Sequence, residues 1–188
     1  MSLAKLAKTP PSTVLGVDAS TRSLAFCLFN GKKVLKYGEV FFEGADVYER
    51  IVDAKRKVRA VAHLAPSEYV AIEAAVMVRS ANTGLKMAYI FGTIMGELLE
   101  DGRSVYEVHP ITWQSYIGNK NFTKAQKLEV QNAYPGKTAN WYKAKVREIR
   151  KQKTIDFCHQ LGVHTESDNV ADACGIGWYA ANNIMRNP

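Results

Sequence analysis

The sequence predicts a three-layer α/β fold in which helices cover both faces of a mixed, five-stranded sheet. Three apolar, β-prone segments open the chain, at 14–18, 24–30 and 33–42, and short turns join them. Strand and helix segments then alternate, which is typical of parallel strands connected by crossover helices. An antiparallel start followed by this alternation indicates one mixed sheet with helices on both faces.

Composition fits a single folded domain. The chain has 188 residues, 47% of them hydrophobic and 23% charged, which is enough for a substantial core. We expect a flexible tail over 1–12 and one domain over 13–188. Three scattered cysteines without any Cys-x-x-Cys pair argue against a disulfide framework and against a zinc ribbon. No segment reaches the roughly 18 uninterrupted apolar residues of a membrane span, and no signal peptide is recognisable. We expect an intracellular, cytoplasmic protein without a membrane partner.

The individual elements follow from periodicity and from turn residues. Asn30-Gly31 favours a tight turn between the second and third strands. Segment 69–76 is apolar except for Glu73, and Thr83 to Glu100 has the spacing of an amphipathic helix. The remaining predictions are a helix over 46–63, a strand over 104–108, a short helix over 110–117, an irregular exposed segment over 118–136, a basic helix over 139–161 and a last helix capped by Ser167 that runs to 184.

Positive charge is concentrated in one part of the chain. Residues 119–157 contain ten basic and three acidic residues, which accounts for the whole net charge of +7. Such a local field attracts phosphate backbones, and the aromatic residues within the segment are candidates for stacking on bases. A solvated helix face is the plainer interpretation. The candidate DNA contacts here are Lys120, Lys124, Lys143, Lys145, Arg147 and Arg150.

Three acids occur in apolar surroundings. Asp18 and Glu73 each end an apolar strand, and Asp172 lies in an apolar final helix. Carboxylates that face an interior are costly unless they are paired or bind a cation, and Mg²⁺ prefers oxygen ligands from separate elements. Asp168 lies four residues before Asp172, on the same helix face. The alternative for Asp18 is an ordinary strand-end residue.

Four segments resemble the RuvC-type Holliday-junction resolvases, which have the RNase H-like (retroviral-integrase) fold. In family order they are VLGVDASTRSLAFCLF, YVAIEAAVMVRSANTGLKMAYIFGTIMGELLEDG, VYEVHPITWQSYIG and DNVADACGIGWYAA. Together they span most of 14–185. DNVADA and HPITWQ look more like phage-type members than like the bacterial housekeeping protein, and a phage protein would act in the host cytoplasm. Relative to the family pattern, 119–142 looks like a basic insertion.

The resemblance implies an endonuclease that cuts four-way and other branched DNA by two-metal hydrolysis and leaves 5′-phosphate and 3′-hydroxyl ends. Asp18, Glu73 and Asp172 would hold two Mg²⁺ ions, with Mn²⁺ as a substitute. The family's fourth ligand corresponds to Asn169, and we favour Asp168 beside it because of its charge. The family's catalytic lysine corresponds to Lys151 or Lys153.

The resemblance also implies DNA contacts after the Glu73 strand and a homodimer. The contacts would come from Arg79, Ser80 and Asn82, and helix 84–100 would form much of the dimer interface. Gly92 and Gly96 would permit close helix approach there, or else pack on the sheet.

Three other functions compete with junction cleavage. One is a catalytically weak protein that binds branched DNA, since Asn169 departs from the ligand pattern. Another is RNase H-like cleavage of RNA–DNA hybrids. The third is an actin-like phosphotransferase, since GVDASTRS also resembles a phosphate loop, although the chain shows no second loop. Elsewhere, Trp113, Trp178, Cys27 and Cys174 are expected in the core, and Gly175 is expected where the last helix approaches the sheet.

Overall fold

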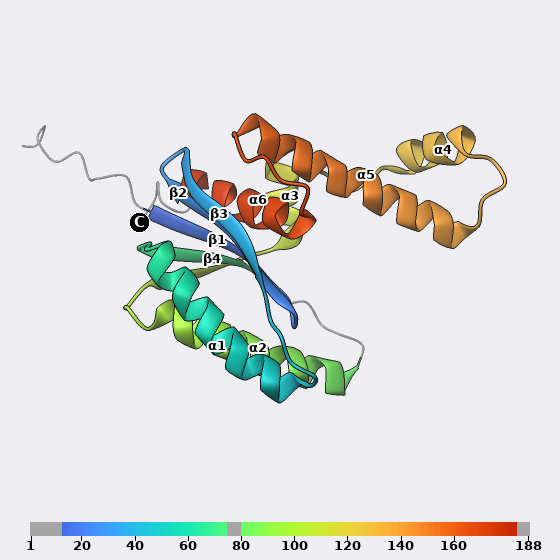
Figure 1. Cartoon of the computed structure of the whole chain (residues 1–188). Coiled ribbons are helices and arrows are strands. Elements are labelled where there is room, and N and C mark those ends of the chain that lie inside the picture. The colour runs from blue at the N-terminus through green and yellow to red at the C-terminus, as the bar shows by residue number, and fades with distance from the viewer. Residues whose placement is uncertain (1–12, 75–79, 184–188) are drawn as a thin grey trace, which may run out of the picture.

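The computed structural model describes residues 13–74 and 80–183 (Figure 1). Its elements in chain order are β1 (Thr13–Ala19), β2 (Ser23–Asn30), β3 (Lys33–Phe41), α1 (Val47–Leu64), β4 (Tyr69–Glu73), α2 (Ala81–Leu99), β5 (Ser104–Val108), α3 (Pro110–Tyr116), α4 (Lys124–Ala133), α5 (Ala139–Gln160) and α6 (Asp168–Asn183). Among the described residues, every predicted strand and helix is present, and α4 is additional. No helix in these two ranges is both long and apolar enough to cross a membrane.

The sheet is mixed, as predicted. Its order is β3-β2-β1-β4-β5, with antiparallel pairing of β1 to β2 and of β2 to β3 and parallel pairing of β1 to β4 and of β4 to β5. Strand residues alternate between two faces. One face packs under α1 and α2 through side chains such as Leu15 and Ile72, and the other packs under α6 through Phe29 and Ala71. Figure 1 shows these helices on opposite sides of the sheet.

Helix α6 lies unusually close to the sheet because glycine faces glycine. A Cβ atom added to Gly16 in β1 would lie 2.5 Å from the backbone nitrogen of Gly177 and 2.6 Å from its Cα. The sequence assigned this role to Gly175, and that assignment is wrong. A Cβ at Gly175 would instead lie 2.6 Å from the Trp113 ring, so Gly175 makes room for α3. The helix position that approaches the sheet is therefore set two residues later than predicted.

Cys27 and Cys174 are buried, as predicted, and Cys158 is buried with them. Cys27, Cys158 and Cys174 are free thiols in the core under α6. Hydrogen bonding to Cys174 and burial raise the pKa of the Cys158 thiol far above its ordinary range. The Cys158 thiol therefore stays protonated, and all three cysteines pack as small core residues.

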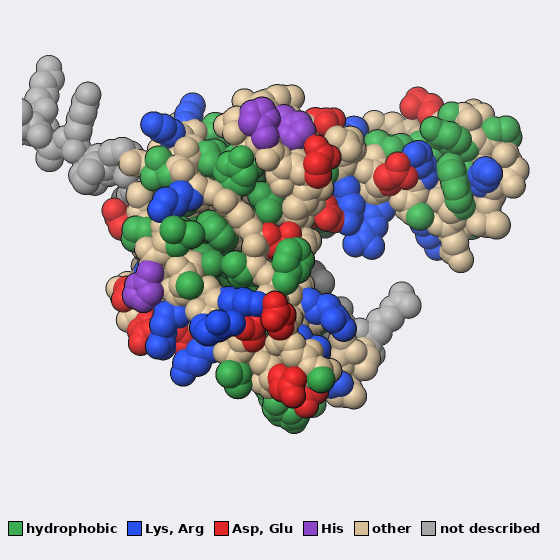
Figure 2. Space-filling model, in the orientation of Figure 1, with side chains coloured by type: hydrophobic (Ala, Val, Ile, Leu, Met, Phe, Trp, Pro, Cys, Tyr) green, Lys and Arg blue, Asp and Glu red, His purple; other side chains and the backbone are tan. Residues whose placement is uncertain are grey.

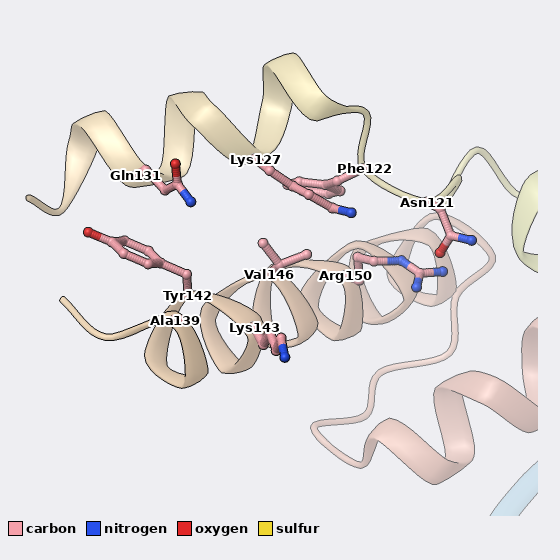
Figure 3. Close-up of a pocket in the computed structure, with 9 residues that line it drawn as sticks. All are labelled: Asn121, Phe122, Lys127, Gln131, Ala139, Tyr142, Lys143, Val146 and Arg150. Carbon is pink, nitrogen blue, oxygen red and sulfur yellow. The ribbon is translucent and has the colours of Figure 1, made fainter.

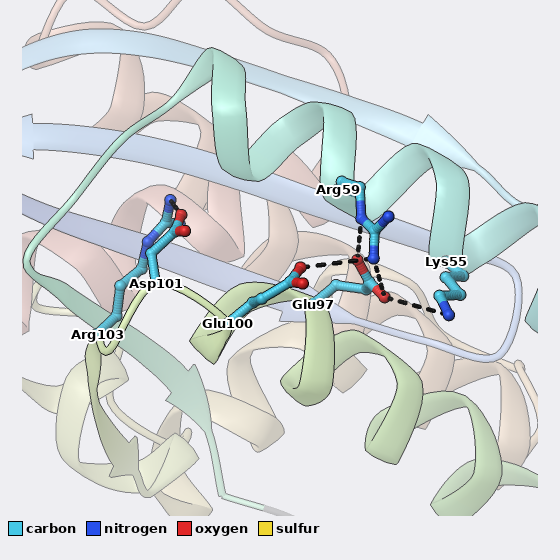
Figure 4. Close-up of polar contacts among 6 residues, drawn as sticks. All are labelled: Lys55, Arg59, Glu97, Glu100, Asp101 and Arg103. Carbon is cyan, nitrogen blue, oxygen red and sulfur yellow. Dashed lines mark hydrogen bonds and ion pairs between the residues drawn. The ribbon is translucent and has the colours of Figure 1, made fainter.

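Helices α1 and α2 are joined by a polar cluster around a buried acid (Figure 4). Glu97 of α2 is only 9% exposed and accepts hydrogen bonds from Arg59 of α1, at 2.7 Å to Nε and 3.3 Å to Nη2. Nearby, Arg103 donates to the carbonyl of Ala62 at 2.8 Å. These contacts fix the α1–α2 layer while the apolar residues of both helices face the sheet.

The opposite face of α2 is open. A Cβ at either Gly92 or Gly96 would have no atom within 4 Å, so these glycines do not pack on the sheet. Leu85 and Tyr89, on the same helix, are 56% and 46% exposed. Because Ile90 and its buried neighbours face the core, α2 presents a second, partly apolar surface to solvent.

Residues 119–150 form a helical arm, which comprises α4 and the first half of α5 and projects from the body (Figure 1). The prediction that 118–136 is irregular is wrong, because α4 lies within it. A capping box starts this helix: Gln126 N–H donates to Thr123 Oγ1 at 3.2 Å, and Thr123 N–H donates to Gln126 Oε1 at 2.9 Å. Tyr134-Pro135-Gly136 makes the turn to α5.

The arm is anchored at its base by a buried amide. Asn119, 4% exposed, donates to the carbonyl of Arg150 at 2.8 Å and to Thr154 Oγ1 at 2.9 Å. The Arg150 guanidinium donates in turn to Gln114 Oε1 of α3 at 2.5 Å. The arm is therefore held against α3 by hydrogen bonds that satisfy its buried polar groups.

Candidate active site

Three acids from three separate elements meet at one end of the sheet. Val17 of β1 pairs with Ile72 of the parallel β4, so Asp18 and Glu73 follow side by side on the face that α6 covers. Asp172 comes from the second turn of α6 above them. The carboxylates are close enough for each of Asp18 and Glu73 to raise the pKa of Asp172.

Burial and mutual repulsion make this set unusually basic for carboxylates. Burial, followed by the charges of Glu73 and Glu39, raises the pKa of Asp18 to about 7. Burial, followed by the charges of Asp18 and Glu73, raises the pKa of Asp172 to about 7 as well. Burial also raises the pKa of Glu73. Clustered acids with raised pKa values are typical of catalytic or cation-binding sites.

The chemistry of these donors fits a hard divalent cation. Mg²⁺ takes carboxylate oxygens, and a bound cation reverses the repulsion that raises these pKa values. Within residues 13–74 and 80–183, no three acidic, histidine or cysteine side chains converge closely enough to hold one ion.

A fourth acid, Glu39 of β3, was not predicted. Asp18 pairs with Ala25, and Ala25 pairs with Glu39, so the two acids lie in one row across three strands with only a methyl group between them. Glu39 accepts hydrogen bonds from Asn169 Nδ2 at 2.6 Å and from Ser167 Oγ at 2.7 Å. Glu39 thus connects the start of α6 to the sheet and engages the amide nitrogen of Asn169.

Trp113 is a core residue, as predicted, and it also contacts the acid set. It is fully buried, and its indole Nε1–H donates to Glu73 Oε1 at 3.0 Å. This hydrogen bond lowers the pKa of Glu73 against the effect of burial. The short helix α3 therefore orients one of the three acids.

The two candidate lysines have different surroundings. Lys151 of α5 forms an ion pair with Asp168, and its charge lowers the pKa of both Asp18 and Asp172. Lys153 lies over the ring of Phe122, 4.9 Å from its centroid. The structure thus brings Lys151 and Asp168 to the acid set and places the ammonium group of Lys153 against the arm.

Several solved structures have a similar fold. RuvC of Thermus thermophilus, in complex with a Holliday junction substrate, matches with 16% identity and a TM-score of 0.67 over 93% of this chain and 96% of that chain. A second T. thermophilus RuvC structure matches with 18% identity and a TM-score of 0.63 over the same shares. The chain has the RuvC fold. The yeast mitochondrial Holliday junction resolvase Ydc2 has this fold too, with 11% identity and a TM-score of 0.56 over 96% of this chain and 85% of that chain. No protein-family model and no curated protein matches the sequence.

On this RuvC fold, the predicted DNA contacts fall into separate groups. Arg79 lies outside the described residues. Ser80 caps α2 by accepting from Thr83 N–H at 3.4 Å, and Asn82 is exposed beside it. On the arm, Lys120, Lys124, Lys143 and Arg147 are exposed. Lys145 forms an ion pair with Glu148, and Arg150 donates a hydrogen bond to Gln114 at the base of the arm.

A cavity of about 360 Å³ joins the acid set to the arm. Its lining combines Asp172 with basic and polar residues from α3, α5 and the loop after α3, namely Gln114, Asn119, Lys143, Val146, Arg147, Arg150, Lys151 and Thr154. Figure 2 shows Lys and Arg side chains gathered where the arm overhangs the body. The positive face of α5 therefore leads from the solvent to Asp172.

Proposed function

We propose that this protein is a metal-dependent endonuclease that cuts four-way DNA junctions. The observation that carries the proposal is the half-buried set of Asp18, Glu73 and Asp172, which lies on a RuvC fold beside a basic cavity. The neighbour of this fold with the highest TM-score reported above was solved with a Holliday junction substrate. The proposed products carry 5′-phosphate and 3′-hydroxyl ends.

Asp18, Glu73, Asp172 and Asp168 would hold two Mg²⁺ ions, or Mn²⁺ in their place, which activate the attacking water and stabilise the leaving oxygen when bound. Asp168 is favoured over Asn169 as the fourth ligand, because its carboxylate is charged and it lies one helical turn before Asp172. Lys151, between Asp168 and the acid set, would neutralise charge on the scissile phosphate.

The arm and α2 supply the remaining parts of the proposal. The exposed bases Lys143 and Arg147 of α5 would bind phosphates that flank the cut. The open face of α2, with Leu85, Tyr89, Gly92 and Gly96, would form the homodimer interface, since close helix approach there meets no atom of the chain's own body. Two copies of the acid set would then nick two strands of one junction.

The test is cleavage of a labelled four-way junction, a matched duplex and an RNA–DNA hybrid in Mg²⁺, Mn²⁺ or EDTA. We expect paired nicks in the junction with either metal, none in EDTA and none with Asp18→Asn. Asp156→Asn, an exposed aspartate of α5, is the matched control and should cleave normally. Tight junction binding without cuts in either metal would overturn the nuclease proposal and favour a junction-binding protein. Preferential cutting of the hybrid would overturn it in favour of an RNase H-like enzyme.

A further inference from the structure

A second cavity lies within the arm, between α4 and α5 (Figure 3). Its volume is about 620 Å³, which is within the range of about 300–1,000 Å³ that is typical of small-ligand sites. Nine residues line it: Asn121, Phe122, Lys127, Gln131, Ala139, Tyr142, Lys143, Val146 and Arg150. A cavity of this size is too small for a DNA duplex and large enough for one nucleotide.

The lining has the chemistry of a nucleotide site. The ring of Tyr142 and the face of Phe122 that Lys153 does not cover offer stacking surfaces, and the amides of Asn121 and Gln131 offer donors and acceptors for a base edge. Its charged residues are all basic, namely Lys127, Lys143 and Arg150. In Figure 3, Gln131 from α4 and Tyr142 and Val146 from α5 point toward one another across the cavity.

Several arm aromatics are occupied elsewhere. Tyr134 and Trp141 lie 5.2 Å apart between ring centroids, and Lys137 lies over the Trp141 ring. The Tyr142 hydroxyl donates to the Tyr134 carbonyl at 2.6 Å, which holds the Tyr142 ring at the cavity wall. The aromatics at the turn therefore stabilise the arm, and Phe122 and Tyr142 are the two that face the cavity.

The cavity adjoins the candidate active site. Lys143, Val146 and Arg150 line both this cavity and the smaller one that contains Asp172. A DNA strand whose phosphate lies at Asp172 therefore has its neighbouring nucleotides near the arm. Bases next to a branch point are the easiest to unstack, because their pairing is already interrupted.

We propose that the arm cavity binds one unpaired nucleotide of the branched DNA, with its base stacked on an aromatic ring of the lining, that of Phe122 or Tyr142, and its phosphate near Lys127 and Lys143. The inference rests on the proposed junction nuclease and adds a site that captures a base beside the cut. It gives the arm a role in selecting DNA with unpaired nucleotides at the branch.

The test compares a perfectly paired four-way junction with the same junction that carries one unpaired 2-aminopurine nucleotide at the branch. Binding is measured in EDTA, so that no cutting is needed. We expect wild-type protein to bind the unpaired form more tightly and to quench 2-aminopurine fluorescence by stacking. Phe122→Ala should lose this preference, with a decrease of roughly 5- to 150-fold in affinity for the unpaired form, which corresponds to one lost base stack.

A second variant fills the cavity without removing a contact. Ala139→Phe, at a residue that lines the arm cavity and not the cavity that contains Asp172, should abolish the quenching and the preference while leaving binding of the paired junction unchanged. Leu128→Ala on α4, a residue that is 55% exposed and does not line the cavity, is the matched control and should behave as wild type.

The two proposals fail in different ways. If wild-type protein cuts the junction but binds both forms equally, or if both cavity variants retain the preference, the nucleotide site is wrong and the nuclease stands. If free thymidine monophosphate binds while the unpaired form gains nothing, the assignment to a DNA nucleotide is overturned. If wild-type protein cuts no DNA in either metal, the nuclease proposal is wrong. The binding preference measured in EDTA still tests whether the arm cavity holds an unpaired nucleotide.

Discussion

The indole nitrogen of Trp113 donates a 3.0 Å hydrogen bond to Glu73 Oε1, so a fully buried aromatic residue orients one of the three clustered acids. Partners of this kind around a metal site typically change metal affinity or activity by about 10- to 100-fold when they are removed. The bond also keeps the pKa of Glu73 lower than burial alone would set it.

Trp113→Phe removes the donor and keeps most of the ring. We expect the Mg²⁺ concentration for half-maximal cleavage to rise by roughly 10- to 100-fold, with little change in junction binding in EDTA. A metal titration of the cleavage rate measures this. Trp178→Phe, at a residue that packs on Phe29 and Phe157, is the control, and an equal effect from it would contradict a specific role for Trp113.

The acid set should make stability fall as pH rises. Asp18 and Asp172 have pKa values of about 7 in the folded protein against 3.8 as their ordinary value, so the folded state holds protons that the unfolded state releases. The raised pKa values add to the free energy of unfolding. This contribution is fully present below pH 3.8 and is lost as pH rises through about 7. Asp18→Asn removes one repelling charge, so at pH 8 in EDTA we expect a Tm roughly 4–8 °C above wild type, corresponding to about 2 kcal/mol.

That difference should shrink toward pH 5, where the wild-type carboxyl is protonated. Thermal melts of wild type, Asp18→Asn and the exposed control Asp156→Asn between pH 5 and pH 8 measure it. A Tm difference for Asp18→Asn that does not change with pH would contradict the raised pKa.

Gly16→Ala should destabilise the protein strongly. Its methyl group would lie 2.6 Å from Gly177 Cα, and backbone cannot move aside as a flexible side chain can. We expect a loss of about 3 kcal/mol in the free energy of unfolding, measured by urea denaturation. Gly92→Ala, whose methyl group meets open space on α2 of the single chain, is the matched control; added to Leu85→Glu, which separates the proposed dimer, it should be neutral or stabilising relative to Leu85→Glu alone. Similar losses in both variants would rule out close packing as the cause.

The basic face of the arm should dominate the salt dependence of DNA binding. Lys143→Ala with Arg147→Ala removes two proposed phosphate contacts, so the slope of log affinity against log salt should decrease by about 2. Fluorescence anisotropy with a junction at several salt concentrations measures it. Lys32→Ala with Lys33→Ala, at the exposed turn between β2 and β3, is the control, because it removes the same charge elsewhere. An equal change in slope would show that the net charge of the protein, and not the position of the arm, sets the salt dependence.

The open face of α2 should control assembly. Leu85→Glu places a charge on the proposed dimer interface without disturbing the core, because Leu85 is already 56% exposed. We expect a monomer by sedimentation velocity and a loss of paired nicking. Val52→Glu, at a residue of α1 that is 72% exposed, is the control, and a wild-type dimer that survives Leu85→Glu would place the interface elsewhere.

The order of strands and helices was predictable because apolar runs and turn residues mark it. Asp18, Glu73 and Asp172 were recognisable because a charge within an apolar run needs an explanation, and the structure brings all three to one end of the sheet. Their catalytic role stays a prediction. Glu39 had no such signal, because the strand that contains it also carries Lys33 and Lys36.

Two errors have different physical origins. Thr123 and Gln126 form a capping box whose spacing was visible, but the Asn, Lys and Gly residues around it suggested irregular structure. Gly175 and Gly177 differ in role because one faces Trp113 and the other faces Gly16. Which glycine meets which element depends on packing between segments that are distant in the sequence, and local spacing does not contain that information.

The acid set draws on the first strand and the last helix, which has a consequence during protein synthesis. β1 and the arm are translated before α6, so a nascent chain carries the basic residues of the arm while Asp172 is still missing. A chain that stops after α5 also lacks the helix that covers one whole face of the sheet. We therefore expect premature termination after α5 to yield a polypeptide that lacks both Asp172 and the helix packed on one face of the sheet.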